Sequence, residues 1–325
     1  MDPLWLPQFW ALLIAFALFV YMVRDGYDLG VGILFGFTRD GSHRETLVRA
    51  ISPFWDGNEV WLILVGAGLF AAFPPVYAIV LPAFYLPLTA MLIALVFRGV
   101  FFEFRNHAGG SRLWDWGFFL GSLAAAFIQG AALGGIVQGI AVADGRYAGG
   151  PFDWLTPFTL TCGTGLTLGY TLLGAAWLVL RTTGETRERA YRLLAGLLVA
   201  FLAVFLIAAL WTTAVHPRLA ARWQESPGLF LAPALGAAAI LGLWTGIRGR
   251  RDSVPYAMTV LLFLALFLAA AGSFWPYLVP FAVGIEAAAA PAGTLRFLFY
   301  GAGIPVFPLV LLYSGVILWI LRGKV

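Results

Sequence analysis

Apolar segments of bilayer length recur along the whole chain, and this pattern constrains the fold more than any other feature. A helix crosses the roughly 30 Å hydrocarbon core of a membrane with about 20 mostly apolar residues. Segments of this kind lie near residues 7–30, 51–73, 77–99, 116–142, 157–180, 193–214, 228–247, 255–275 and 297–321. In lipid, a helix satisfies its own backbone hydrogen bonds. The sequence therefore predicts an all-α polytopic membrane protein of about nine transmembrane helices, in a single transmembrane helical domain over residues 1–325.

Composition supports this prediction and narrows the function. Hydrophobic residues make up 61% of the chain and charged residues 11%, whereas soluble domains have about 45–50% apolar and 25% charged residues. A lone cysteine, Cys162, excludes a disulfide within the chain and a thiolate metal site. The excess of arginine is typical of cytoplasmic loops in a membrane protein and does not indicate a nucleic-acid partner. No basic residue precedes Arg24, so we expect no cleaved signal peptide.

Basic residues are concentrated in alternate loops. Fourteen of them follow the first, third, fifth, seventh or ninth apolar segment, and only four lie in the other loops. Loops rich in Lys and Arg stay in the cytoplasm. We therefore expect the N-terminus outside and the C-terminus in the cytoplasm. Termini on opposite sides of the membrane require an odd number of spans, which agrees with nine.

Ionisable residues at membrane depth are rare and usually functional, and most of those in this chain fall in its first third. Asp25 and Asp28 lie late in the first predicted helix, and Asp56 and Glu59 lie early in the second. The i, i+3 spacing places each pair on one face of its helix. The helix directions place all the candidates toward the cytoplasmic side, and the full set is Asp25, Asp28, Asp56, Glu59, Arg98, Glu103 and Asp115.

This set suggests proton chemistry, because its six carboxylates outnumber the three arginines near them. An unpaired carboxylate in a low-dielectric environment tends to bind a proton, and a series of such groups is suited to a proton relay. Pairing with a partner subunit is an alternative. A structural interpretation also stays open, in which Asp25 and Asp56 cap helix starts or breaks beside Gly26 and Gly57.

A metal or haem site within this chain is disfavoured by its few histidines. Hard cations bind carboxylate oxygens, but redox metals in helix bundles usually have histidine ligands as well. His43, His107 and His216 all fall in predicted loops. We therefore expect no metal and no cofactor held by side chains of this chain.

Several motifs in the first third resemble subunit II of the cytochrome bd-type quinol oxidases. They occur in the family's order and read "DGYDLGVG" at 25–32, "PFWDGNEVWL" at 53–62, "FRGVFFEFR" at 97–105 and "WDWGFFLGS" at 114–122. A later stretch, "GSFWPYLVP" at 272–280, is similar to a motif in the family's eighth helix. Between residues 123 and 271 the likeness rests on hydropathy and helix count.

The resemblance implies a haem-free, nine-helix subunit that stabilises a haem-bearing subunit I in a prokaryotic cytoplasmic (inner) membrane. The partner would carry haems b and d, or haem b only, and the complex would oxidise quinol and reduce dioxygen to water with cytoplasmic protons. Lipid and a small accessory subunit are further expected partners. The positions that match the family's polar signature are Asp25, Asp28, Trp55, Asp56, Asn58, Glu59, Arg98, Glu103 and Asp115. Among them, Trp55 and Asn58 are candidates for a quinone contact or a structural contact.

Two interpretations from other functional classes stay open. A secondary transporter would also place carboxylates in broken helices, but its site should lie near the midplane and recur in two repeats. The sequence shows neither feature. A purely structural membrane partner would tolerate neutralisation of the carboxylates, whereas a proton path would not.

Overall fold

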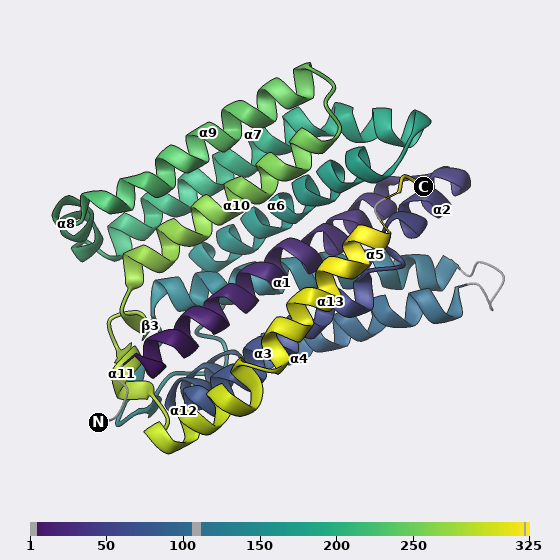
Figure 1. Ribbon diagram of the computed structural model, residues 1–325. Coiled ribbons are helices and arrows are strands. Elements are labelled where there is room, and N and C mark those ends of the chain that lie inside the picture. Colours follow the sequence, from purple (N-terminus) through teal and green to yellow (C-terminus); the bar gives the residue numbers. More distant parts are fainter. Residues whose placement is uncertain (1–4, 106–111, 322) are drawn as a thin grey trace.

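Long helices lying side by side form the body of the protein (Figure 1). The computed structural model describes residues 5–105, 112–321 and 323–325. The helices are α1 (Leu6–Phe37), α2 (Gly41–Ile51), α3 (Trp55–Ala72), α4 (Pro74–Phe104), α5 (Arg112–Gln138), α6 (Pro157–Arg181), α7 (Gly184–Val215), α8 (Arg218–Glu225), η1 (Pro227–Phe230), α9 (Leu231–Arg248), α10 (Ser253–Phe274), α11 (Ile285–Ala288), α12 (Ala292–Leu298), η2 (Phe299–Gly303) and α13 (Val306–Ile320). Two antiparallel hairpins pair β1 (Val142–Ala143) with β2 (Arg146–Tyr147) and β3 (Tyr277–Val279) with β4 (Val283–Gly284).

Local sequence explains where several helices begin and where one bends. The side chain of Asp40 accepts hydrogen bonds from the backbone N–H groups of Ser42 and His43, which caps the start of α2. Thr156 and Thr159 form a reciprocal capping box at the start of α6. Within α4 the backbone leaves helical geometry at Phe84, between two internal prolines. A proline removes a backbone donor and its ring crowds the preceding turn, so a kink is expected there.

Close helix crossings hold the bundle together. Helix α1 packs against α3, α5 and α6, and α6 also packs against α7 and α10. At the crossing of α1 and α6, a Cβ added to Gly30 would lie 1.8 Å from the carbonyl oxygen of Tyr170. Glycine is therefore required for the two backbones to approach this closely, as in other membrane helix pairs. The crossing lies in the C-terminal half of α1, where the residues from Asp25 to Phe35 are buried.

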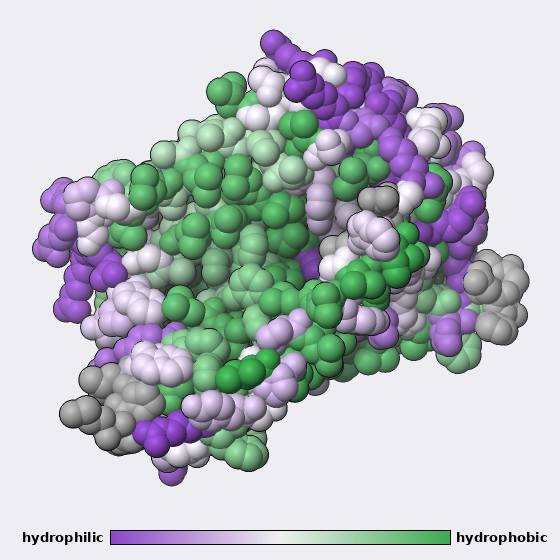
Figure 2. Space-filling view, viewed as in Figure 1, coloured by the Kyte–Doolittle hydropathy of each residue, from purple (hydrophilic) through white to green (hydrophobic). Residues whose placement is uncertain are grey.

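The prediction of an all-α polytopic membrane protein is confirmed. Eight helices among the described residues are long and apolar enough to cross a membrane. The predicted second span, 51–73, corresponds to α3, whose first two turns contain Asp56, Asn58 and Glu59. The predicted ninth span, 297–321, is interrupted, because α12 is followed by the π-helical turn η2 before α13. Figure 2 shows an apolar band across the middle of one face, with hydrophilic residues at both ends.

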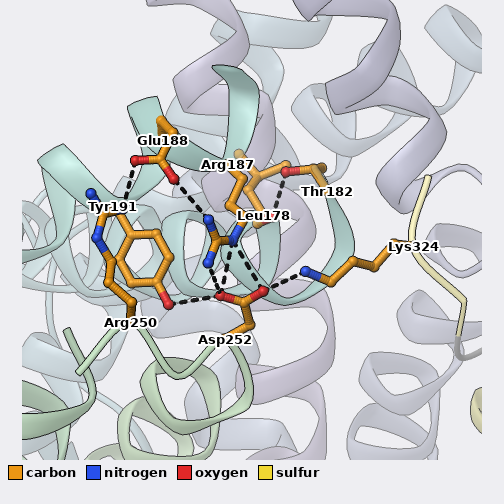
Figure 3. Close-up of polar contacts among 8 residues, drawn as sticks. All are labelled: Leu178, Thr182, Arg187, Glu188, Tyr191, Arg250, Asp252 and Lys324. Atoms are coloured by element: carbon orange, nitrogen blue, oxygen red, sulfur yellow. Dashed lines mark hydrogen bonds and ion pairs between the residues drawn. The ribbon is translucent and has the colours of Figure 1, made fainter. Parts of the chain in front are cut away.

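Ionic contacts hold together the end of the bundle that carries α2 (the α2 end). Nε2 of His43 on α2 lies 3.5 Å from Oε2 of Glu185 at the start of α7. Figure 3 shows Asp252, just before α10, accepting hydrogen bonds from Arg187, Tyr191 and Lys324. Partial burial acts to raise the pKa of the Asp252 carboxyl, but these three donors outweigh it and lower that pKa. Asp252 therefore joins α7, α10 and the segment after α13 as an anion.

Orientation stays a prediction, and reporter fusions test it. Fusions at Arg187 and at Val325 should both report the cytoplasm, because both positions belong to the arginine-rich set of loops. A fusion at Asp144, in the turn between β1 and β2, should report the outside and serves as the control. An outer signal at Arg187 or Val325 would contradict the predicted arrangement of spans.

Substitution Asp252→Asn should lower the melting temperature of the detergent-purified protein by about 2–4 °C at neutral pH, equivalent to about 1 kcal/mol for a partly exposed network. Because the folded-state pKa of Asp252 is lowered, its contribution is present above the unfolded value of about 4 and is lost as the pH falls through the folded value. The difference between variant and wild type should therefore shrink in acid. Substitution Asp144→Asn, in the exposed hairpin turn, is the control. Equal melting temperatures at pH 7 would contradict the assigned role.

Candidate functional site: a buried ion cluster

Arg98 lies at the centre of the site and is fully buried within α4. Its Nη1 donates a hydrogen bond of 2.6 Å to Oδ1 of Asp25 on α1. Its Nη2 donates to Oε1 of Glu59 on α3. The Asp25 side chain is fully buried, whereas that of Glu59 is 27% exposed. One guanidinium therefore joins two carboxylates from two different helices.

Asn58, which precedes Glu59 on α3, joins a second cation to a third carboxylate. Its side-chain nitrogen donates to the Tyr27 hydroxyl at 2.8 Å and to Oδ2 of Asp28 at 2.7 Å. Its side-chain oxygen accepts a hydrogen bond of 2.7 Å from Nε of Arg24. Both Asn58 and Asp28 are buried. The buried cluster thus contains Asp25, Asp28 and Glu59 against Arg24 and Arg98.

Unpartnered atoms remain inside the cluster. Oδ2 of Asp25, Oδ1 of Asp28 and Nε of Arg98 have no hydrogen-bond partner among the described residues. Buried polar atoms are nearly always paired in native proteins. The two free oxygens are positions where a proton or a further polar group can be accepted.

A small cleft connects the cluster with the surface. It has a volume of about 110 Å³ and lies between α1, α3 and α13, with Arg24, Asp56, Tyr313 and Ser314 in its lining. Asp56 is exposed in the first turn of α3, and its charge interacts with that of Glu59 one turn further on. The order of acidic groups is therefore Asp56 at the cleft, then Glu59, then the Arg98–Asp25 pair.

Some of the predicted site residues lie elsewhere. Asp115 pairs with Arg44 at 2.9 Å and with Arg105 at 3.2 Å. Arg105 follows Arg98 by two helical turns, or about 10 Å along the helix axis. The prediction that charges from four helices meet at one depth is therefore wrong for Asp115. Asp115 lies in the first turn of α5, which begins at Arg112, and this turn is at the α2 end.

Two other predicted residues have more peripheral positions. Glu103 is exposed in the last turn of α4. Trp55 stacks on Phe102, with the ring centroids 4.8 Å apart and an interplanar angle of 8°. Together with the fully engaged side chain of Asn58, this stacking favours a structural contact over a quinone contact for Trp55 and Asn58.

Two members of the site were not among the predicted site residues. Arg24 was counted only as one of the three arginines near the carboxylates, and in the structure it donates a hydrogen bond to Asn58. Tyr27, inside the "DGYDLGVG" motif, accepts a hydrogen bond from Asn58. A search for charged residues in apolar segments does not detect tyrosine, because its side chain is a neutral phenol. Tyr27 and Asp28 follow Arg24 by three and four residues, so the three side chains share one face of the helix. This spacing could have indicated from the sequence that they belong to one site.

The described histidines do not fit a haem or metal site in this chain. No group of three or more His, Cys, Asp or Glu residues that could hold a metal ion is found among the described residues. His216 places Nε2 2.6 Å from the carbonyl oxygen of Val137, and His43 lies between Asp40 and Glu185. The predicted loop residue His107 lies outside the described residues.

Substitution Arg98→Met should cost about 3–5 kcal/mol, because it leaves Asp25 buried without a cation. The expected result is loss of most folded protein, measured as the monodisperse yield and the melting temperature after detergent extraction. Substitution Arg146→Met removes an exposed arginine of β2 and should have little effect. Wild-type yield and stability for Arg98→Met would show that the buried pair is not needed for folding.

Comparisons with known proteins agree on one family. The model described as Cytochrome bd terminal oxidase subunit II matches residues 6–321. Cytochrome bd-I ubiquinol oxidase subunit 2 of Escherichia coli (strain K12) is 32% identical, over 97% of this chain and 94% of that protein. Cytochrome bd ubiquinol oxidase subunit 2 of Bacillus subtilis (strain 168) is 35% identical over 63% of this chain and 62% of that protein. A chain of the bd oxidase from Geobacillus thermodenitrificans shares the fold, with a TM-score of 0.75 at 17% identity, over 97% of this chain and 99% of that chain. The protein therefore belongs to the cytochrome bd terminal oxidase subunit II family.

Proposed function

We propose that this subunit stabilises a haem-bearing subunit I and supplies a polar path for cytoplasmic protons used in the reduction of dioxygen to water. Family membership and the ubiquinol oxidase relatives support a quinol as the reductant. In this proposal haems b and d, or haem b only, belong to the partner, and this chain holds none. The complex lies in a prokaryotic cytoplasmic (inner) membrane, and the α2 end faces the cytoplasm.

The observation that carries the proposal is that two carboxylates share one buried guanidinium. Arg98 needs only one anion to be balanced. With Arg24 included, the buried cluster contains three carboxylates and two arginines. Neutralising the excess charge with a proton avoids the cost of an unpaired buried anion. The cluster is therefore built to hold a proton.

Glu59 is the group whose position best suits proton movement. It is partly exposed, it lies one turn from Asp56 at the cleft, and it contacts Arg98. When Glu59 takes up a proton, Arg98 keeps Asp25 as its counter-ion, so no buried cation is stranded. Asp28, with one free oxygen, lies deeper in the same cluster. Protons would thus pass from Asp56 to Glu59 and on toward Asp28 and the partner subunit.

Substitutions Asp56→Asn and Glu59→Gln test the path in the complete oxidase. Each amide keeps the shape of the side chain and removes its titration, and each leaves Arg98 paired with Asp25. We expect normal haem content, with turnover lower by about tenfold or more and the largest loss at alkaline pH, where proton supply limits the rate. The measurement is quinol-driven oxygen consumption across pH, together with the haem content of the purified complex.

The control for both variants is Asp144→Asn, which neutralises a carboxylate in the hairpin turn between β1 and β2. It should keep wild-type turnover. Full activity of Asp56→Asn and Glu59→Gln at every pH, with normal haem content, would reject the path and support a purely structural partner. Loss of haem content in Asp56→Asn would instead assign this carboxylate to a fixed ion pair needed for assembly.

A further inference from the structure

Two neighbouring arginines in the turn between α9 and α10 have different surroundings. Arg250 donates a hydrogen bond of 2.6 Å to Glu188 on α7, and its guanidinium lies 4.8 Å from the ring centre of Tyr191. Arg251 is exposed, and its side chain has no hydrogen bond or ion pair to any residue that the structure describes. A guanidinium has five N–H donors, arranged to bind a phosphate or a carboxylate. Arg251 therefore offers a complete set of donors at the surface.

The backbone of the turn leaves this positive charge unopposed. Arg250 has a φ of 53°, in the left-handed region that favours glycine. The N–H of Gly249 donates to the carbonyl oxygen of Thr245 at 2.8 Å, and the N–H of Arg251 donates to that of Gly246 at 3.2 Å. Carbonyl oxygens at the end of α9 are thus already engaged by the turn. An anion at this turn would meet the Arg251 side chain rather than unpaired carbonyl oxygens.

A cavity opens between the end of α9 and the start of α10, beside Arg251. It has a volume of about 220 Å³, and its lining consists of Thr245, Gly246, Gly249, Arg251 and Val254. The arginine is the one charged residue in this lining. Because a water molecule takes up roughly 30 Å³ of the liquid, the cavity has room for a polyatomic anion such as a phosphate group.

The face of α9 next to the cavity is suited to lipid. Leu241 is 65% exposed and Trp244 is 39% exposed, and Arg248 follows Trp244 by one helical turn with its guanidinium 4.8 Å from the ring centre. Thr245, which lines the cavity, follows Leu241 by four residues and lies on the same face. An apolar, then aromatic, then basic order toward a helix end is typical of the boundary between hydrocarbon and headgroups. The cavity therefore lies where lipid headgroups are expected.

Acidic residues at this end of the bundle are engaged elsewhere. Glu188 accepts hydrogen bonds from Arg187 and Arg250. Figure 3 shows Asp252 bound by Arg187 and by Lys324 of the segment after α13. Both carboxylates thus already have cationic partners of their own. The positive charge beside the cavity is left for a partner from outside the chain.

We propose that the cavity between α9 and α10 binds the phosphodiester headgroup of an anionic phospholipid. Arg251 binds the phosphate oxygens, Arg248 adds a second positive charge, and an acyl chain lies along Leu241 and Trp244. A free phosphate ion has the same headgroup chemistry but lacks the apolar contact with α9, so the surface favours lipid. The site is separate from the proposed proton path and does not depend on it.

The test measures binding of phosphatidylglycerol to the complete oxidase in detergent, by native mass spectrometry across a lipid titration. The wild type should retain phosphatidylglycerol in preference to phosphatidylcholine with the same acyl chains. Substitution Arg251→Gln should lower the affinity for phosphatidylglycerol about fivefold, the scale of one arginine at an anionic membrane surface, and should leave phosphatidylcholine binding unchanged. Substitution Thr245→Leu keeps every charge but fills the cavity, so it should also weaken binding of phosphatidylglycerol.

Substitution Arg189→Gln is the matched control, because it removes an exposed arginine of α7 at the same end of the bundle that pairs with Glu185. It should keep wild-type binding. Equal losses in Arg251→Gln and Arg189→Gln, or no loss in Arg251→Gln, would show only a general attraction of anionic lipid and overturn the inference. If Arg251→Gln does not assemble, Thr245→Leu decides by the same criterion.

Two further outcomes would also overturn the inference. Inorganic phosphate added at the concentration of the lipid should not displace phosphatidylglycerol, and displacement would assign the cavity to a free anion. Equal retention of phosphatidylglycerol and phosphatidylcholine by the wild-type oxidase would show that the turn does not select anionic lipid, as expected if a protein partner covers Arg251.

Discussion

A charged guanidinium inside an apolar helix bundle is the constraint on which the rest of the site depends. Arg98 is fully buried, and a buried cation is tolerated only when anions and hydrogen bonds replace its water. Asp25 and Glu59 supply the anions. Asp25 lies on α1, Glu59 on α3 and Arg98 on α4. The ion pairs therefore also hold these three helices together at one level. The same contacts that hold the helices together therefore also arrange the carboxylates of the proposed proton path.

Close backbone contact between α1 and α6 is what makes this arrangement possible. In a membrane, helices associate through packing rather than through exclusion of water, so small residues at the crossing matter. Gly30 allows the approach, and the approach places α6 and α5 side chains beside the ion cluster. Hydrogen bonds from Tyr170 to Gln129 and from Gln129 to Tyr21 join α6, α5 and α1 where these helices meet. Helix packing in this subunit thus also positions the residues of the proposed proton path.

Prediction from the sequence succeeded where the signal is local. Hydropathy located the helices to within several residues, although it could not show that η2 interrupts the last span or that α2 forms a separate short helix. The motifs identified Asp25, Asp28, Asn58, Glu59 and Arg98, which the structure brings together. Asp115 was grouped with them because helix direction gives depth only coarsely. Its partners Arg44 on α2 and Arg105 after α4 come from other helices, and no local pattern reports how those helices are placed relative to α5.

The sequence by itself determined the class of protein, the approximate helices and the family, because hydropathy over about 20 residues and short ordered motifs are properties of the chain alone. The tertiary structure decided which charges meet, since Asp25, Glu59 and Arg98 are separated by dozens of residues and their contacts depend on helix rotation and crossing. It also decided that Arg98 is shared by two carboxylates and that hydrogen bonds join Tyr170, Gln129 and Tyr21 across three helices. Such contacts depend on the rotation and crossing of helices that are far apart in the sequence, and no local pattern reports them.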